Sequence, residues 1–139
     1  MFLLESTEVT RPRASGQALV EFALMVSVFM LLVLGTFDVA RAYLAYTVTT
    51  NAVREVARYG AAHSSEPNWQ TAAVQSGMNL AVGVDTSALQ LSTPSQQVID
   101  QLTYIRASGS YSFHSVTPLV SALLGDPINV QVATAMLAG

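Results

Sequence analysis

Residues 16–37 read GQALVEFALMVSVFMLLVLGTF, and this stretch decides the fold. From Ala18 to Phe37 the only charged side chain is Glu21, and no proline interrupts the run. Twenty residues at about 1.5 Å each make a helix of about 30 Å, which matches the hydrocarbon thickness of a bilayer. Within that layer a single segment satisfies its own backbone polar groups only as a helix. The stretch therefore predicts a transmembrane helix over residues 18–37.

The composition of the whole chain agrees with a membrane protein. Of its 139 residues 51% are hydrophobic and only 11% are charged, against about 25% charged in an ordinary soluble domain. The length leaves room for one domain beyond the span. All six Lys or Arg positions are arginine and the formal net charge is −3, so no basic patch is available to bind nucleic acid. The absence of cysteine excludes disulfides, thiolate metal sites and cysteine nucleophiles.

The flanking charges predict the orientation. Arg11 and Arg13 precede the span, which favours a cytoplasmic N-terminus and an extracytoplasmic C-terminal domain, although Arg41 weakens this bias. A secretory signal peptide cut near residues 40–42 is the less favoured alternative, because its apolar core would be about 7–15 residues long. A simple membrane anchor remains open.

Glu21 completes a pattern with the residues before it. A carboxylate in an apolar run is costly in lipid and therefore usually has a partner or a task. The sequence RPRASGQALVEF over residues 11–22 resembles a prepilin processing site, in which a polar leader ends at Gly16, Gln17 becomes the new N-terminus and Glu21 is the fifth mature residue. From Gly16 to about Ala62 the chain is similar to the TadE-like family of tight-adherence (Tad/Flp) pilus systems. Its Asn-Ala-x-Arg-Glu-x-Ala-Arg stretch stands here at Asn51, Ala52, Arg54, Glu55, Ala57 and Arg58.

This resemblance implies a minor pilin or pseudopilin in the assembly or structure of an adhesive pilus, without enzymatic activity. Its partners would be inner-membrane lipid, a prepilin peptidase, other pilin-like subunits through the N-terminal helix, and the assembly machinery. Gly16 and Gln17 would be processing residues, and Glu21 with Phe22 would act in assembly. An α-amine freed at Gln17 is mostly cationic at neutral pH and can neutralise Glu21 of a neighbouring subunit in lipid. Glu21 as a tolerated interfacial side chain, in an uncleaved single-pass binding module, is the alternative.

Helical periodicity continues past the span and predicts one helix over residues 17–62, after a leader at 1–16. The helix is expected to kink, if anywhere, at Gly35 or at Thr47–Thr50, where glycine or β-branched residues lower helix propensity. The pairs Asp38–Arg41 and Glu55–Arg58 are interpreted as a solvated face. A narrow stripe predicts packing on a neighbour; it consists of Val39, Tyr43, Tyr46, Thr50, Val53, Ala57 and Gly60.

The head, residues 63–139, predicts an α+β fold with one further helix and a three-stranded, mostly antiparallel sheet. A helix is expected over 67–82 with Ser65 as its N-cap. A short strand is expected over 88–91, and residues 104–114 alternate as a strand with a bulge or turn at Gly109. A helical turn at 117–124 and a last strand at 128–137 complete the head.

Catalytic sites find little support in the sequence. His63 and His114 are the only histidines, and no HExxH, GxSxG, Walker or GxGxxG pattern accompanies them. The sequence therefore predicts no metal, no cofactor and no catalytic residues, and an anchored hydrolase has no motif to support it. Core packing is favoured over an adhesive surface for the aromatic residues; these are Trp69, Tyr104, Tyr111 and Phe113.

Overall fold

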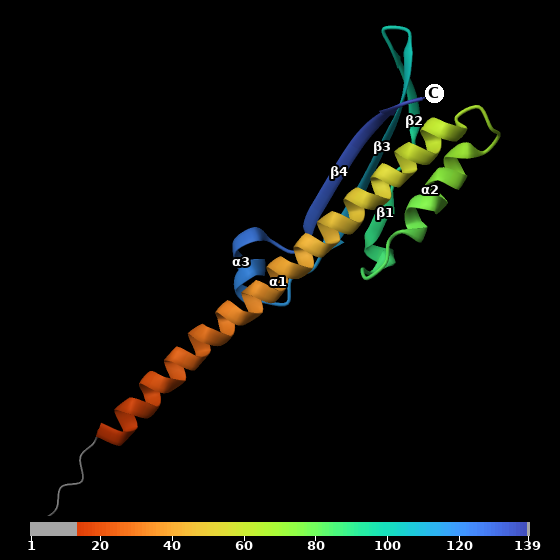
Figure 1. Cartoon of the computed structure of the whole chain (residues 1–139). Coiled ribbons are helices and arrows are strands. Elements are labelled where there is room, and N and C mark those ends of the chain that lie inside the picture. Colours follow the sequence, from red (N-terminus) through yellow and green to blue (C-terminus); the bar gives the residue numbers. More distant parts are fainter. Residues whose placement is uncertain (1–13, 139) are drawn as a thin grey trace, which may run out of the picture.

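One continuous helix, α1 (Ala14–His63), forms the axis of the molecule (Figure 1). The computed structural model describes residues 14–138, so most of the predicted leader, including Arg11 and Arg13, lies outside the described residues. α1 has 50 residues and is unbroken at both expected weak points. The hydroxyls of Thr36, Thr47 and Thr50 each donate to the carbonyl four residues earlier, at 2.7–2.8 Å. These bonds satisfy the hydroxyls without opening the helix.

The head is built on the C-terminal half of α1. After α1 the chain turns back into α2 (Trp69–Asn79), which packs beside it (Figure 1). A 3-10 turn, η1 (Thr86–Ala88), leads into the strands β1 (Leu89–Leu91), β2 (Ser95–Ile99) and β3 (Leu102–Phe113). A short helix, α3 (Pro118–Leu124), precedes the last strand, β4 (Ile128–Leu137). The fold is α+β, as predicted.

The sheet is antiparallel and has β3 at its centre. β4 pairs with β3 along ten residues, from Tyr104 with Leu137 to Phe113 with Ile128. On the other side of β3, β2 and β1 lie one after the other, paired with its first and second halves. The sheet is therefore three strands wide, as expected, but it contains a fourth strand, β2, that the sequence did not predict. All five residues of β2 are exposed, so this strand has no alternation of apolar and polar residues to identify it.

α1 and α2 cover one face of the sheet. One cluster of buried side chains joins Val53, Val56 and Ala57 of α1 to Trp69 and Ile105. A second cluster joins Ala45 and Val48 of α1 to β1 and to the end of β3. The predicted packing of aromatic residues in the core is confirmed for Trp69, Tyr111 and Phe113, which are buried. Tyr104 is half-buried and belongs to neither core cluster.

Two local predictions in the head are wrong. α2 begins at Trp69 after Asn68, which has a φ of 61° and no side-chain cap, so Ser65 is not the N-cap. Gly109 makes no bulge, because the pairing of β3 with β4 continues through it. Glycine is needed there for close packing: a Cβ would lie 2.8 Å from both Val53 and Leu91.

Candidate functional site

The first 22 helical positions from Gly16 project beyond the head as an arm, residues 16–37 (Figure 1). Its large apolar side chains are exposed from Leu19 to Phe37, with the single exception of the half-buried Val33. α1 is the one helix among residues 14–138 that is long and apolar enough to cross a membrane. A continuous apolar surface of this size marks contact with lipid or with other proteins.

The predicted processing and assembly residues all lie in the first turns of the arm. Gly16, Gln17, Glu21 and Phe22 are exposed. Gln17 and Glu21 are four positions apart, which places them on the same face of the helix. No ion pair or hydrogen bond formed within the described residues involves the Glu21 side chain. A Cβ at Gly16 would meet no atom within 4 Å, so a small side chain fits this position without a clash.

The stripe predicted to pack on a neighbour divides into two parts. Val39, Tyr43 and Tyr46 are exposed, whereas Val53 and Ala57 are buried against this chain's own sheet. At 3.6 residues per turn, Val39 and Ala57 are five turns apart and point to the same side of α1. Their exposure differs because α2 and the sheet pack only against the C-terminal part of the stripe. Only its N-terminal part remains available to a partner.

Asp38 joins the arm to the head. Its side chain is 2% exposed, and its carboxylate accepts the backbone N–H groups of Val116, at 3.0 and 3.1 Å, and of Thr117, at 2.7 Å. Val116 and Thr117 are the two residues just before α3, so a carboxylate on α1 satisfies backbone donors at the entry to another helix. The Val116 N–H above all holds the pKa of Asp38 below its ordinary value, and Arg41, at 3.6 Å, contributes least. Asp38 is thus ionised and fixes α3 to α1.

The interpretation of Asp38 as part of a solvated face is wrong. Its partners lie 78 and 79 positions away in the sequence, so no local spacing reveals them. The one available signal is an acidic residue between Phe37 and Val39, directly after the apolar run. A charge in such surroundings is seldom buried without a dedicated partner.

The Asn-Ala-x-Arg-Glu-x-Ala-Arg stretch forms the contact between α1 and α2. Arg58 donates two hydrogen bonds to Glu55, at 2.6 and 2.7 Å, and Ser76 of α2 donates a third at 2.9 Å. The Arg58 guanidinium is the main cause of the lowered pKa of Glu55. Ala52 and Ala57 are fully buried. Glu55 therefore links two helices, which the expectation of a solvated pair did not include.

Comparison with known families agrees with this geometry. The model of the family described as TadE-like protein matches residues 16–58. Over these residues the chain is similar to that family. The match starts at Gly16 and ends at Arg58, so it covers the arm, the junction at Asp38 and the contact stretch of α1. Comparisons with curated proteins and with solved structures gave no significant match.

The TadE-like segment confirms the resemblance predicted from the sequence. One long apolar helix near the N-terminus fits a membrane anchor. The family model therefore matches both the arm that leaves the head and the part of α1 that packs against the head.

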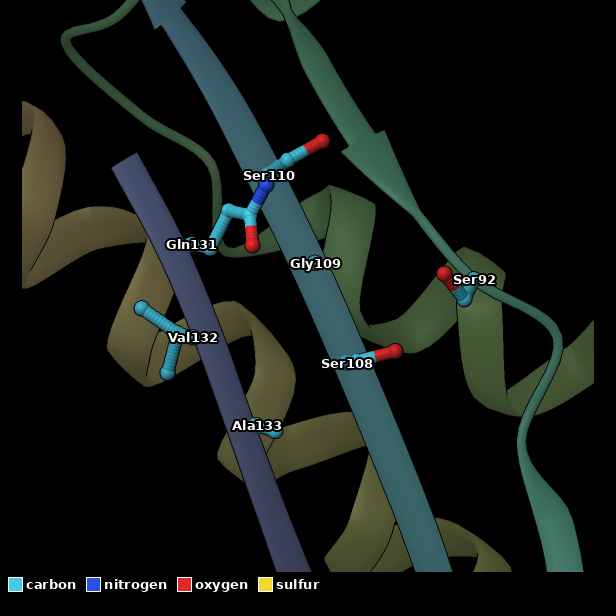
Figure 2. A pocket seen from close by; sticks show the side chains of 7 residues that line it. All are labelled: Ser92, Ser108, Gly109, Ser110, Gln131, Val132 and Ala133. Atoms are coloured by element: carbon cyan, nitrogen blue, oxygen red, sulfur yellow. The ribbon is translucent and has the colours of Figure 1, made fainter. Parts of the chain in front are cut away.

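Outside the TadE-like segment, a shallow hollow lies on the face of the sheet opposite to α1 (Figure 2). Hydroxyl and amide groups predominate in its polar lining, and it contains no acid, base or histidine; its residues are Ser92, Ser108, Gly109, Ser110, Gln131, Val132 and Ala133. Such groups can form hydrogen bonds but provide no general base near neutral pH.

The two histidines lie in separate environments. His63 stacks on Tyr59 and contacts its carbonyl at 3.0 Å, while His114 lies 3.1 Å from Asp126. Residues 14–138 contain no group of three or more potential metal ligands among His, Cys, Asp and Glu.

Proposed function

We propose that this chain is a pilin-like subunit of an adhesive Tad/Flp-type pilus, processed after Gly16 by a prepilin peptidase. The observation that carries the proposal is the arm, an exposed apolar helix with a single carboxylate five positions after Gly16. A helix of this kind is stable only in lipid or against similar helices. The head faces the extracytoplasmic side, in accord with Arg11 and Arg13 before the span.

Cleavage at Gly16 creates the partner for Glu21. The amine freed at Gln17 has an ordinary pKa of about 7.7–8.0 and is mostly cationic at neutral pH. A carboxylate at the centre of a bilayer costs about 2.5 kcal/mol or more, and less near the edge. When two arms lie side by side with a stagger, the amine of one neutralises Glu21 of the other. The charge pair therefore sets the register of assembly, while exposed Phe22, Tyr43 and Tyr46 supply contacts between helices.

Processing is tested by the mass and the N-terminus of the native protein. A chain that begins at Gln17 supports the proposal, and an intact Met1 supports the uncleaved single-pass binding module. Gly16→Ala is expected to block cleavage because it changes the residue at the cut. Gly35→Ala is the matched control, since it adds the same methyl group to the same helix, again with nothing within 4 Å. Loss of cleavage in both variants contradicts recognition at Gly16.

Assembly is tested by Glu21→Gln, which removes the charge and keeps the shape. The variant is expected to insert into the membrane and to be cleaved, but not to enter the pilus. Ser27→Ala is the control for a polar residue of the arm, because its hydroxyl bonds only to the carbonyl of Ala23 in its own helix. Incorporation of Glu21→Gln at the wild-type level refutes the role of the charge pair.

A further inference from the structure

α3 has a composition that is unusual for an exposed surface helix. Its sequence, PLVSALL, contains no charged residue. Leu123 is 75% exposed, Leu124 is 70% exposed, and Val116, just before the helix, is 67% exposed. Large apolar side chains that are exposed together on one element mark contact with a membrane or another protein.

The structure places α3 where the arm leaves the head. Asp38 accepts the N–H groups of the two residues before α3, and Asp38 is the first residue after the predicted span of 18–37. Figure 1 shows α3 beside α1 at the boundary between the free arm and the head. The polar layer on each side of the hydrocarbon is about 5–8 Å thick, or about four to five residues of helix. With the arm in a bilayer, α3 therefore lies at the height of this layer.

The polar groups around α3 suit an interface. Within α3, the Ser121 hydroxyl donates to the Pro118 carbonyl, and the Gly125 N–H donates back to the Ser121 carbonyl. The charges nearest in sequence are outside the helix, where Asp126 pairs with His114. Tyr43, exposed on α1 a little more than one turn after Asp38, belongs to a residue type enriched at membrane–water boundaries.

We propose that α3 is a second membrane contact, in which Val116, Leu123 and Leu124 enter the extracytoplasmic lipid interface beside the arm. The hydrogen bonds to Asp38 hold α3 directly beside the end of the lipid-facing arm, and this position identifies lipid as the occupant. The contact prevents the head from rotating freely about a single anchor. The inference rests on membrane insertion of the arm, and it is independent of cleavage and of pilus assembly.

The absence of cysteine makes the test direct, because any introduced cysteine is a unique labelling site. The full chain carrying Leu123→Cys is labelled with an environment-sensitive fluorophore and reconstituted in vesicles of phosphatidylethanolamine and phosphatidylglycerol. Val98→Cys is the matched control, since Val98 is 70% exposed on β2, in the hairpin on the head far from the arm. Leu24→Cys reports insertion of the arm.

The label at position 123 is expected to emit at shorter wavelength than the label at 98. It should also be quenched several-fold more strongly by lipids spin-labelled near the headgroup, and less by aqueous iodide. Equal iodide quenching at 123 and 98, with lipid quenching at 24, overturns the α3 contact and leaves the anchor intact. A label at position 123 that is protected from iodide but not quenched by the lipids also overturns the α3 contact, because protein then covers α3. No lipid quenching at 24 overturns both the anchor and the contact.

Discussion

Replacing Gly77 with alanine is expected to force α2 away from α1. Gly77 is buried in α2, and a Cβ there would lie 2.5 Å from Cγ2 of Val56 and 2.8 Å from the carbonyl oxygen of Ala52. The oxygen belongs to the backbone of α1 and cannot move unless the helix moves. Val56 is buried and β-branched, and such a side chain has one strongly preferred rotamer in a helix. Neither neighbour can give way cheaply.

The size of the effect follows from two opposing terms. Overpacking a core costs about 1–3 kcal/mol, and the backbone contact puts this site near the upper end. Alanine recovers at most about 1 kcal/mol of helix propensity relative to glycine. The net loss in free energy of unfolding is therefore about 2 kcal/mol. For a head of about 100 residues this lowers the thermal midpoint by roughly 8–16 °C.

Trp69 provides the assay, because it is the only tryptophan and lies in the same core. Its fluorescence is followed during thermal unfolding of the full chain in detergent micelles. Gly35→Ala is the control and is expected to leave the midpoint of the head unchanged, since its new methyl group meets nothing within 4 Å. Adding Val56→Ala to Gly77→Ala relieves one of the two contacts, so the combined loss should be smaller than the sum of the single losses. A Gly77→Ala midpoint at or above that of the wild type refutes the close-packing argument.

Three further changes probe the head with the same fluorescence assay. Asp38→Asn should lower the thermal midpoint at neutral pH. The pKa of Asp38 is depressed in the folded protein, so its carboxylate stabilises the head above the ordinary pKa of 3.8, and this stabilisation is lost as the pH falls through the lower folded pKa. The midpoints of the two proteins should therefore converge in acid. Divergence in acid would contradict this. Ile105→Ala, at a fully buried position, should cost about 2–5 kcal/mol in denaturant titrations, and a loss below 1 kcal/mol would exclude Ile105 as a core residue. Arg58→Ala should lower the thermal midpoint only slightly, and the difference should shrink in high salt, because Arg58 is largely exposed and Glu55 keeps its hydrogen bond from Ser76. A large decrease in the midpoint that does not depend on salt would argue against this.

The parts of the fold that were predicted correctly are those with a local signal. The arm is one uninterrupted apolar run, and β3 and β4 alternate residue by residue, so period and length alone identify them. β2 has no such signal, because all its residues are exposed and its pairing with β3 is what makes it a strand. The turn between them, Asp100–Gln101, adopts positive φ at both residues without glycine, so the usual hairpin signal is missing as well.

The candidate site divides in the same way. Gly16, Gln17 and Glu21 stand at a spacing that the sequence displays directly, and their roles in processing and assembly stay predictions; the family match begins at Gly16. Asp38 was misread because its partners are the N–H groups of the two residues before α3, which reach it only after the whole head has folded. A contact of this range depends on tertiary structure, whereas i,i+3 spacing suggests only Arg41.

The unbroken course of α1 couples events in the membrane to the position of the head. Asp38 lies 17 positions after Glu21, which at about 100° per residue places the two carboxylates about 100° apart around the helix axis. A neighbouring arm that pairs with Glu21 therefore approaches a different side of α1 from the one that holds α3. Because no hinge separates these residues, the register that we propose for Glu21 would also determine which face of the head meets the neighbour. Under this proposal, one helix determines both how neighbouring arms pair in the membrane and how the head is oriented outside it.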